Sequence, residues 1–326
     1  MGHKPMSEVL LDVNQLRVTF HGHPAVHDIS YRIHAGEIVG IVGESGCGKS
    51  LASLTLMGLQ PSIMQASGSV TFAGQNILTN TAEQWQKLRG EGIAMIFQEP
   101  MTALNPVVTV GDQIAEMFLL HQGDNKAQAR QKAIEMLEQV HIPDPLRRAK
   151  AYPHELSGGM RQRVMIAMAL ACRPKLIIAD EPTTALDVTV QAQVLDLLEE
   201  LRETTGTAIQ FISHNLGVVS QLADRVVVMY TGRVVEEGTS DQLFSDPQHP
   251  YTQGLLATLP RIGHRQARLP AIAGSVPPLG QRSLGCPFVD RCQQAKPLCH
   301  QQMPATLSLS NSHSVACHQV EFAHAS

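Results

Sequence analysis

The sequence lacks the features that would place the chain across a membrane or on nucleic acid. No run among its 326 residues approaches the roughly 18 apolar residues of a membrane span, and no basic segment followed by an apolar one opens the chain. Lysines and arginines form no block, and the formal net charge is −4. We therefore expect a cytoplasmic chain that has no nucleic-acid partner and reaches a membrane only through other proteins.

Repeats are also missing. The sequence has no internal repeat at a fixed period, no low-complexity run and no sustained heptads, which excludes solenoids and long coiled coils. On the usual prior of about 150 residues per domain, the length predicts two domains. Prolines are spaced through the sequence from about residue 246, with little helical period after Leu259, so we predict domains at 1–245 and 246–326.

A phosphate-binding loop is the strongest motif. The segment GESGCGKS at 43–50 fits G-x-x-x-x-G-K-[ST] between an apolar strand pattern at 37–42 and a helical pattern at 51–57. Glycines let backbone amides close around phosphates at a helix N-terminus. Lys49 is expected to reach the β- and γ-phosphates and Ser50 to ligate Mg²⁺, unless the match is a chance glycine-rich turn. The residues predicted to bind ATP here are Gly43, Ser45, Gly46, Cys47, Gly48, Lys49 and Ser50.

Two adjacent carboxylates follow a second buried strand. The apolar run at 176–179 has the pattern of a central parallel strand and ends in Asp180 and Glu181. Ligands bind at the carboxyl ends of such strands, although paired acids on a loop are often only solvated surface. We predict that Asp180 holds Mg²⁺ and that Glu181 deprotonates the attacking water.

Three further polar or aromatic residues stand at strand ends. Gln98 follows the strand pattern at 92–97, and His214 follows the one at 208–213, where a phosphate contact is favoured over plain polar surface. Phe20 ends a strand of an alternating region at 9–40 that predicts an antiparallel sheet. Its ring either stacks on adenine or packs in the core, and the spacing does not decide between them.

A predominantly helical insert lies between the phosphate loop and the strand that ends in Asp180 and Glu181. Residues 112–140 are predicted to be helical, because Ala133, Met136, Leu137 and Val140 recur at helical spacing. After it, Ser157 is predicted to cap a helix, and Gly158 and Gly159 leave backbone amides open to an anion. A plain helix start, with the helical run itself at 164–172, is the alternative.

Taken in order, these motifs resemble the ATP-binding subunits of ABC transporters, in particular the peptide and nickel uptake group. In that family's terms, 43–50 resembles Walker A, Gln98 the Q-loop, LSGGM at 156–160 the signature motif, LIIADE at 176–181 Walker B, 185–187 the D-loop and His214 the switch histidine. Phe20 falls where the family has an adenine-stacking aromatic. Met160 departs from the usual glutamine, with little expected loss.

The resemblance implies an α/β fold and a transport motor. The fold would be a P-loop NTPase with a RecA-like core, an antiparallel β subdomain, a helical subdomain at about 99–165 and a loop-rich C-terminal extension. Two such domains dimerise head to tail, so that Ser157, Gly158 and Gly159 would contact the γ-phosphate held by the other subunit. Catalytic roles would fall to Glu181, His214 and Gln98, with Gln98 also a Mg²⁺ ligand.

The resemblance also implies partners that this chain does not contain. They are two transmembrane permease subunits, a second homologous ATP-binding subunit, with a heterodimer favoured, and an extracytoplasmic substrate-binding protein. The chain would lie peripherally on the cytoplasmic face of a bacterial inner membrane. Dipeptides or oligopeptides lead as cargo, ahead of nickel or other small solutes. A soluble ABC ATPase would share every nucleotide motif, whereas a phosphate-loop kinase would not need the signature motif or His214.

Four cysteines gather late in the chain, at Cys286, Cys292, Cys299 and Cys317. A proline-rich segment with few apolar residues needs a cross-link, such as a disulfide or a bound metal, to hold its fold. Disulfides are disfavoured in the cytoplasm. Zinc accepts four thiolates, with His300 or His318 as substitutes, but the usual close C-x₂-C pair is missing. Some members of the resembled group carry a [4Fe–4S] cluster on cysteines with this layout, so we favour that cluster over zinc and over no metal.

Overall fold

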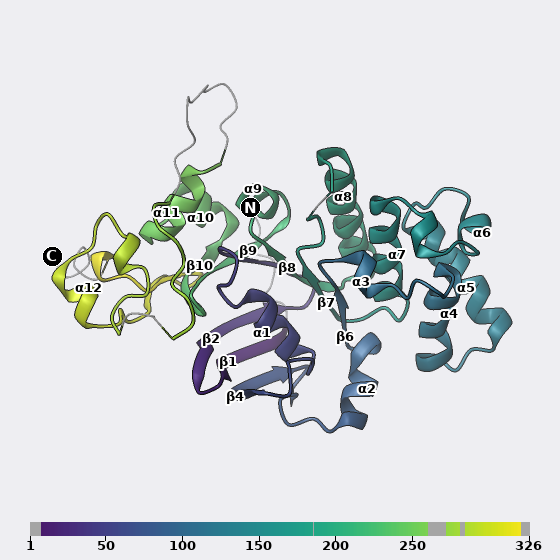
Figure 1. The fold of residues 1–326 in the computed structure, drawn as a ribbon, viewed down its shortest axis with the longest axis horizontal. Coiled ribbons are helices and arrows are strands. Elements are labelled where there is room, and N and C mark those ends of the chain that lie inside the picture. Colours follow the sequence, from purple (N-terminus) through teal and green to yellow (C-terminus); the bar gives the residue numbers. More distant parts are fainter. Residues whose placement is uncertain (1–7, 185, 260–271, 281–283, 321–326) are drawn as a thin grey trace. The chain divides into compact units, whose positions relative to one another are not determined.

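The computed structural model describes residues 8–184, 186–259, 272–280 and 284–320 (Figure 1). The chain divides into two compact units. The first unit contains the chain up to Leu10, His34–Glu37 and Thr79–Gln210. The second contains Leu11–Ile33, Ile38–Leu78 and the chain from Phe211 onward. Both are discontinuous in sequence, and the predicted domain division at residue 245 falls inside the second. No helix among the described residues is long and apolar enough to cross a membrane.

The first unit is mainly helical around two parallel strands. Strand β6 (Ile93–Ile96) pairs with β7 (Leu176–Asp180) in parallel, with Ile93 opposite Leu176 and Ile96 opposite Ala179. All five residues of β7 are buried, as its continuous apolar run predicts. The helices of the first unit are α2 (Ala82–Glu91), α3 (Pro100–Ala103), α4 (Val110–His121), α5 (Lys126–Gln139), α6 (Pro145–Arg148), α7 (Gly158–Leu170) and α8 (Val188–Thr205), with a 3-10 turn η1 (Pro153–Glu155).

The stretch predicted to be helical, 112–140, is divided between two helices. Helix α4 ends at His121 and α5 begins at Lys126, after a turn in which Gly123 has a φ of 68°. Asn125 starts α5 with a capping box, in which its side chain accepts from the amide of Gln128. The stripe of Ala133, Met136, Leu137 and Val140 is buried as predicted, and α4, α5 and α7 pack together (teal in Figure 1).

The second unit carries most of the strands. They are β1 (Val9–Phe20), β2 (His23–His34), β3 (Ile38–Val42), β4 (Met64–Phe72), β5 (Gln75–Asn76), β9 (Arg225–Tyr230), β10 (Arg233–Thr239), β11 (Leu307–Ser310) and β12 (His313–Val315), while β8 (Ala208–Ser213) and the ends of β1 and β2 cross the unit boundary. Its helices are α1 (Lys49–Leu56), α9 (Leu216–Leu222), α10 (Ser240–Ser245), α11 (Pro250–Ala257) and α12 (Pro297–Gln301), with a 3-10 turn η2 (Val289–Arg291).

The predicted antiparallel sheet is present and has the strand order β2-β1-β4-β5. Pro24 lies inside β2. This is compatible with pairing because β2 is an edge strand of that sheet, where a missing N–H costs no internal hydrogen bond. Phe20 is the last residue of β1, as predicted.

Within the second unit, strands of the C-terminal extension pair with the hairpin that precedes it. Strand β9 pairs in parallel with β3 and forms a hairpin with β10 through Thr231 and Gly232, whose φ angles are 44° and 82°. Strand β12 then pairs with β10, and β11 with β12. Val315, Cys317 and Val320 form a small core beneath them. The extension predicted as loop-rich therefore also lengthens a sheet.

His249, the residue that caps α11, should make stability depend on pH. Its Nδ1 accepts a hydrogen bond from the amide of Tyr251 at 3.0 Å, its own amide donates to Glu236, and burial lowers its pKa from 6.5 to about 3. The unfolded chain then binds a proton that the folded chain does not, so stability present above pH 6.5 is lost progressively as the pH falls toward 3.

We expect this histidine to remove about 2 kcal/mol of stability between pH 8 and pH 5. Replacing His249 by asparagine keeps a capping acceptor without the titration, so denaturant unfolding of the variant should show a smaller loss over the same range. Equal pH dependence in the wild type and the variant would contradict the assignment.

Candidate nucleotide-binding site

The predicted phosphate loop connects β3 to α1, and its backbone needs glycine at two points. A Cβ on Gly43 would lie 2.2 Å from the carbonyl oxygen of Met229, and Gly48, with a φ of 97°, starts α1 from a left-handed conformation. Gly46 also has a positive φ, of 79°, but nothing lies within 4 Å of its added Cβ. The loop is therefore packed at both ends and open at Gly46.

Lys49 is drawn into this loop. Only 5% of Lys49 is exposed, and its Nζ donates to the carbonyl oxygens of Gly43 at 2.7 Å and Glu44 at 3.1 Å. The Cys47 sulfur lies 3.7 Å from the same Nζ, and burial raises the pKa of that thiol. Ser45, Gly46 and Ser50 are exposed. A fixed ammonium at a helix N-terminus beside exposed backbone suits a polyphosphate.

Glu44, to which the sequence assigned no role, is held from outside the loop. Its amide donates to the hydroxyl of Tyr251 at 2.8 Å, and its carboxylate forms a two-point ion pair with Arg291, at 2.5 and 3.0 Å. The pair raises the pKa of Arg291, chiefly through the hydrogen bond to Glu44, so the guanidinium stays charged. Both partners belong to the C-terminal extension.

In the first unit, the structure brings Gln98 and Glu181 together. Gln98 lies exposed two residues after β6, and its Nε2 donates to Oε2 of Glu181 at 3.2 Å. Thr184 donates to the same oxygen at 2.9 Å. Glu181 has a φ of 47°, an uncommon backbone for a non-glycine residue that turns the chain at the end of β7. Asp180, the last residue of β7, is 5% exposed.

The predicted capping role of Ser157 is confirmed. Its hydroxyl accepts from the amide of Met160 at 3.3 Å, and α7 begins at Gly158, six residues earlier than the helical run predicted from 164. Gly158 is exposed, and an added Cβ there would find only Leu186, at 4.0 Å. On Gly159 it would lie 2.6 Å from the side chain of Val190. Packing within this chain thus requires glycine at position 159 but not at position 158.

Phe20 and His214 lie in the second unit with the phosphate loop. Phe20 is half-buried, and its ring meets that of His21 nearly edge-on, with centroids 4.3 Å apart. His214 is exposed directly after β8. Of the predicted D-loop, Ala185 lies outside the described residues, while Asp187 caps α8 by accepting from the amide of Val190.

The four late cysteines are unbonded and come near one another. Cys286 and Cys292 flank η2, Cys299 lies in α12 and Cys317 follows β12; all but Cys292 are buried. The amide of Cys286 donates to the carbonyl oxygen of Cys299 at 2.7 Å. Burial raises the pKa of Cys286 to about 11, and the other three thiols add to the shift. Among the described residues, however, no three His, Cys, Asp or Glu side chains are arranged to hold a metal ion.

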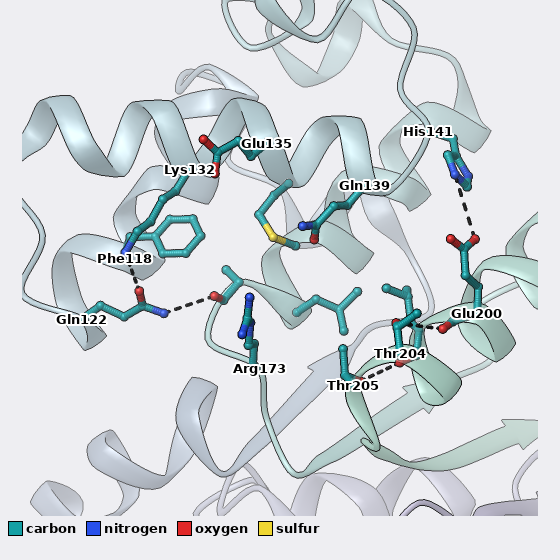
Figure 2. A pocket seen from close by; sticks show the side chains of 14 residues that line it. Phe118, Gln122, Lys132, Glu135, Gln139, His141, Arg173, Glu200, Thr204 and Thr205 are labelled. Atoms are coloured by element: carbon teal, nitrogen blue, oxygen red, sulfur yellow. Dashed lines mark hydrogen bonds and ion pairs between the residues drawn. The ribbon is translucent and has the colours of Figure 1, made fainter.

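The first unit also contains a cavity of about 770 Å³ that none of the predicted nucleotide residues lines (Figure 2). Lys132 extends over the ring of Phe118 and donates to Gln122 at 2.8 Å, and on the other side His141 lies 4.0 Å from Glu200. The residues that line the cavity come mainly from α4, α5 and the end of α8.

Comparison with known proteins decides the family. The model of the ABC transporter family matches residues 26–184, and that of the oligopeptide/dipeptide transporter C-terminal region matches 235–299. The chain is 49% identical to the probable peptide ABC transporter ATP-binding protein y4tR of Sinorhizobium fredii, over 97% of each chain. It belongs to the ATP-binding subunits of ABC transporters.

Further similarities agree with this assignment. The oligopeptide transport ATP-binding protein OppD of Salmonella typhimurium is 50% identical, over 91% of this chain and 90% of that protein. Among solved structures, a dimeric post-hydrolysis state of the ATP-binding cassette MJ0796 with ADP and phosphate matches with a TM-score of 0.64 and 27% identity, covering 71% of this chain and 99% of that one. The expected ABC cassette fold is confirmed, and the chain is an ATPase.

Proposed function

We propose that this ABC ATPase powers the import of dipeptides or oligopeptides. The observation that carries the proposal is the C-terminal region matched at 235–299, because it is described for oligopeptide and dipeptide transporters and lies outside the motor motifs shared by all ABC proteins. Relatives at 49% and 50% identity bear peptide and oligopeptide transport names. The chain would work peripherally on the cytoplasmic face of a bacterial inner membrane.

In this proposal, the chain's own residues divide the work on ATP. Lys49 and the amides of the 43–50 loop bind the phosphates, and Phe20 stacks on the adenine. Ser50, Asp180 and Gln98 would hold Mg²⁺, which supplies charge neutralisation at the phosphates when bound. Glu181 takes a proton from the attacking water, and His214 contacts the γ-phosphate.

The proposed assembly supplies what one chain lacks. A second ATP-binding subunit, preferably a related but non-identical one, offers its signature motif to the γ-phosphate, as Ser157, Gly158 and Gly159 of this chain do for the partner. Two permease subunits carry the pathway, and an extracytoplasmic protein delivers the peptide. ATP binding closes the ATPase pair, and hydrolysis opens it.

Uptake by the reconstituted transporter tests this proposal. The complete complex in liposomes, with its binding protein outside and ATP inside, should accumulate a labelled dipeptide or tripeptide and should not accumulate ⁶³Ni²⁺. A complex carrying Glu181→Gln is the negative control. Nickel accumulation without peptide accumulation, or ATP hydrolysis with neither, would overturn the peptide assignment.

We further propose that Cys286, Cys292, Cys299 and Cys317 hold a [4Fe–4S] cluster. Their common location and the burial of Cys286, Cys299 and Cys317 support it, since four thiolates are the ligand set of such a cluster. The thiols must turn toward one another, because the described side chains are not arranged for a metal. Zinc is the competing occupant, and a metal-free packing role is the other.

Full-length protein purified without oxygen should therefore be brown, with broad absorption at roughly 400 nm. Cys292→Ser should abolish the colour, whereas Cys172→Ser, which changes a cysteine in the first unit, should leave it. Colourless protein with stoichiometric zinc would replace the cluster by zinc. Protein with neither metal would leave the four cysteines as packing residues.

A further inference from the structure

Arg291 of the C-terminal extension is buried against the phosphate loop, although 247 residues separate it from Glu44. Only 4% of its side chain is exposed, compared with 31% of the Glu44 side chain. Two guanidinium nitrogens each donate to a different carboxylate oxygen of Glu44. Such a two-point contact fixes the orientation of both groups as well as their distance.

Groups other than Glu44 also hold the guanidinium of Arg291 in place. The Nε of Arg291 donates to the carbonyl of Ala273 in the extension at 2.8 Å, and one terminal nitrogen donates to the hydroxyl of Tyr230 at the end of β9 at 3.3 Å. The rings of Tyr230 and Phe288 lie 5.7 and 5.9 Å from its central carbon. Arg291 is therefore a fixed anchor to which the more exposed Glu44 is attached.

Glu44 transmits this anchoring to Lys49. The Glu44 amide is bound by Tyr251, its carboxylate by Arg291, and its carbonyl oxygen accepts from Nζ of Lys49. Three groups of one loop residue are thus engaged at once, two of them by the extension. If Arg291 is removed, the carboxylate of Glu44 will rotate toward solvent, and the carbonyl of Glu44 that orients Lys49 will shift with it.

We infer that Arg291 is a positioning residue for ATP binding, acting through Glu44 on the phosphate loop, so that the C-terminal extension forms part of the nucleotide-binding machinery. The inference rests on the proposed binding of ATP phosphates by Lys49. It gives Glu44, a position that the loop motif leaves variable, a defined role. It also means that changes in the cysteine segment beside Arg291 can reach the nucleotide.

The test separates positioning from stability with a matched control. Arg291→Met in the assembled transporter should raise the KM for ATP by about tenfold and change kcat by less than about twofold, with Arg291→Lys intermediate. The control is Arg225→Met, which breaks another little-exposed ion pair of the second unit, with Glu237, at the opposite end of β9 from Tyr230. It should lower the unfolding temperature and leave KM unchanged.

A double-mutant cycle with Glu44→Gln completes the test. Glu44→Gln should raise KM as Arg291→Met does, and the double variant should be no worse than either single one, because both act through one contact. If Arg291→Met does not fold, Arg291→Lys and Glu44→Gln decide. Unchanged KM in the folded variants, or fully additive effects, would overturn the inference. Failure of wild-type protein to bind ATP would instead overturn the proposed function.

Discussion

An assembled transporter carrying Glu181→Gln should bind ATP normally and hydrolyse it roughly a thousandfold more slowly, because the amide cannot accept the proton of the attacking water. The substitution is nearly isosteric. The amide oxygen of glutamine can still accept from Gln98 and Thr184, which hold the carboxylate at 3.2 and 2.9 Å. Lys49, Ser50 and Asp180 are unchanged, so ATP affinity should be retained.

Steady-state turnover and ATP binding, measured on the same preparation, check this expectation. Glu203→Gln, an exposed glutamate near the end of α8, is the matched control and should hydrolyse ATP at the wild-type rate. Near-normal turnover of Glu181→Gln would remove Glu181 from the role of general base. Loss of ATP binding would instead mean that Glu181 supports the fold of the site.

Local pattern predicts those parts of the site whose chemistry is contained in a short segment. The short continuous apolar run of β7 predicted a buried strand, so Asp180 was correctly placed at its carboxyl end. Gly43 of the phosphate loop occupies a position that no other residue fits, because an added Cβ would lie 2.2 Å from the carbonyl oxygen of Met229.

Long-range pairing escaped prediction because it leaves no periodic trace. Nothing near residue 291 indicates that its side chain binds Glu44, and nothing in 313–315 indicates pairing with β10. The break between α4 and α5 was also missed, since one apolar stripe can continue across a short turn. Gly123 and the capping residue Asn125 were the available signals.

Gly158 offers the sharpest separation of fold from function within the signature motif. An added Cβ would meet only Leu186, at 4.0 Å, and the φ of Gly158 is not positive, so alanine fits the first turn of α7 without strain. Such a replacement reduces the freedom of the unfolded chain and should raise stability by about 0.5 kcal/mol. Gly159→Ala would not be informative, because its Cβ collides with Val190.

Gly158→Ala should nevertheless lower ATP turnover of the assembled transporter by about a hundredfold, the usual cost of losing one preorganised backbone donor. In the proposed dimer, the Gly158 amide approaches the γ-phosphate held by the other subunit, and a methyl group there keeps the two apart. Thermal unfolding of the single chain and turnover of the complex measure the two effects separately. Wild-type turnover in a stabilised variant would show that Gly158 does not face ATP. A less stable variant would show that the added methyl group clashes with atoms of this chain, so that the loss of turnover could not be assigned to the dimer interface.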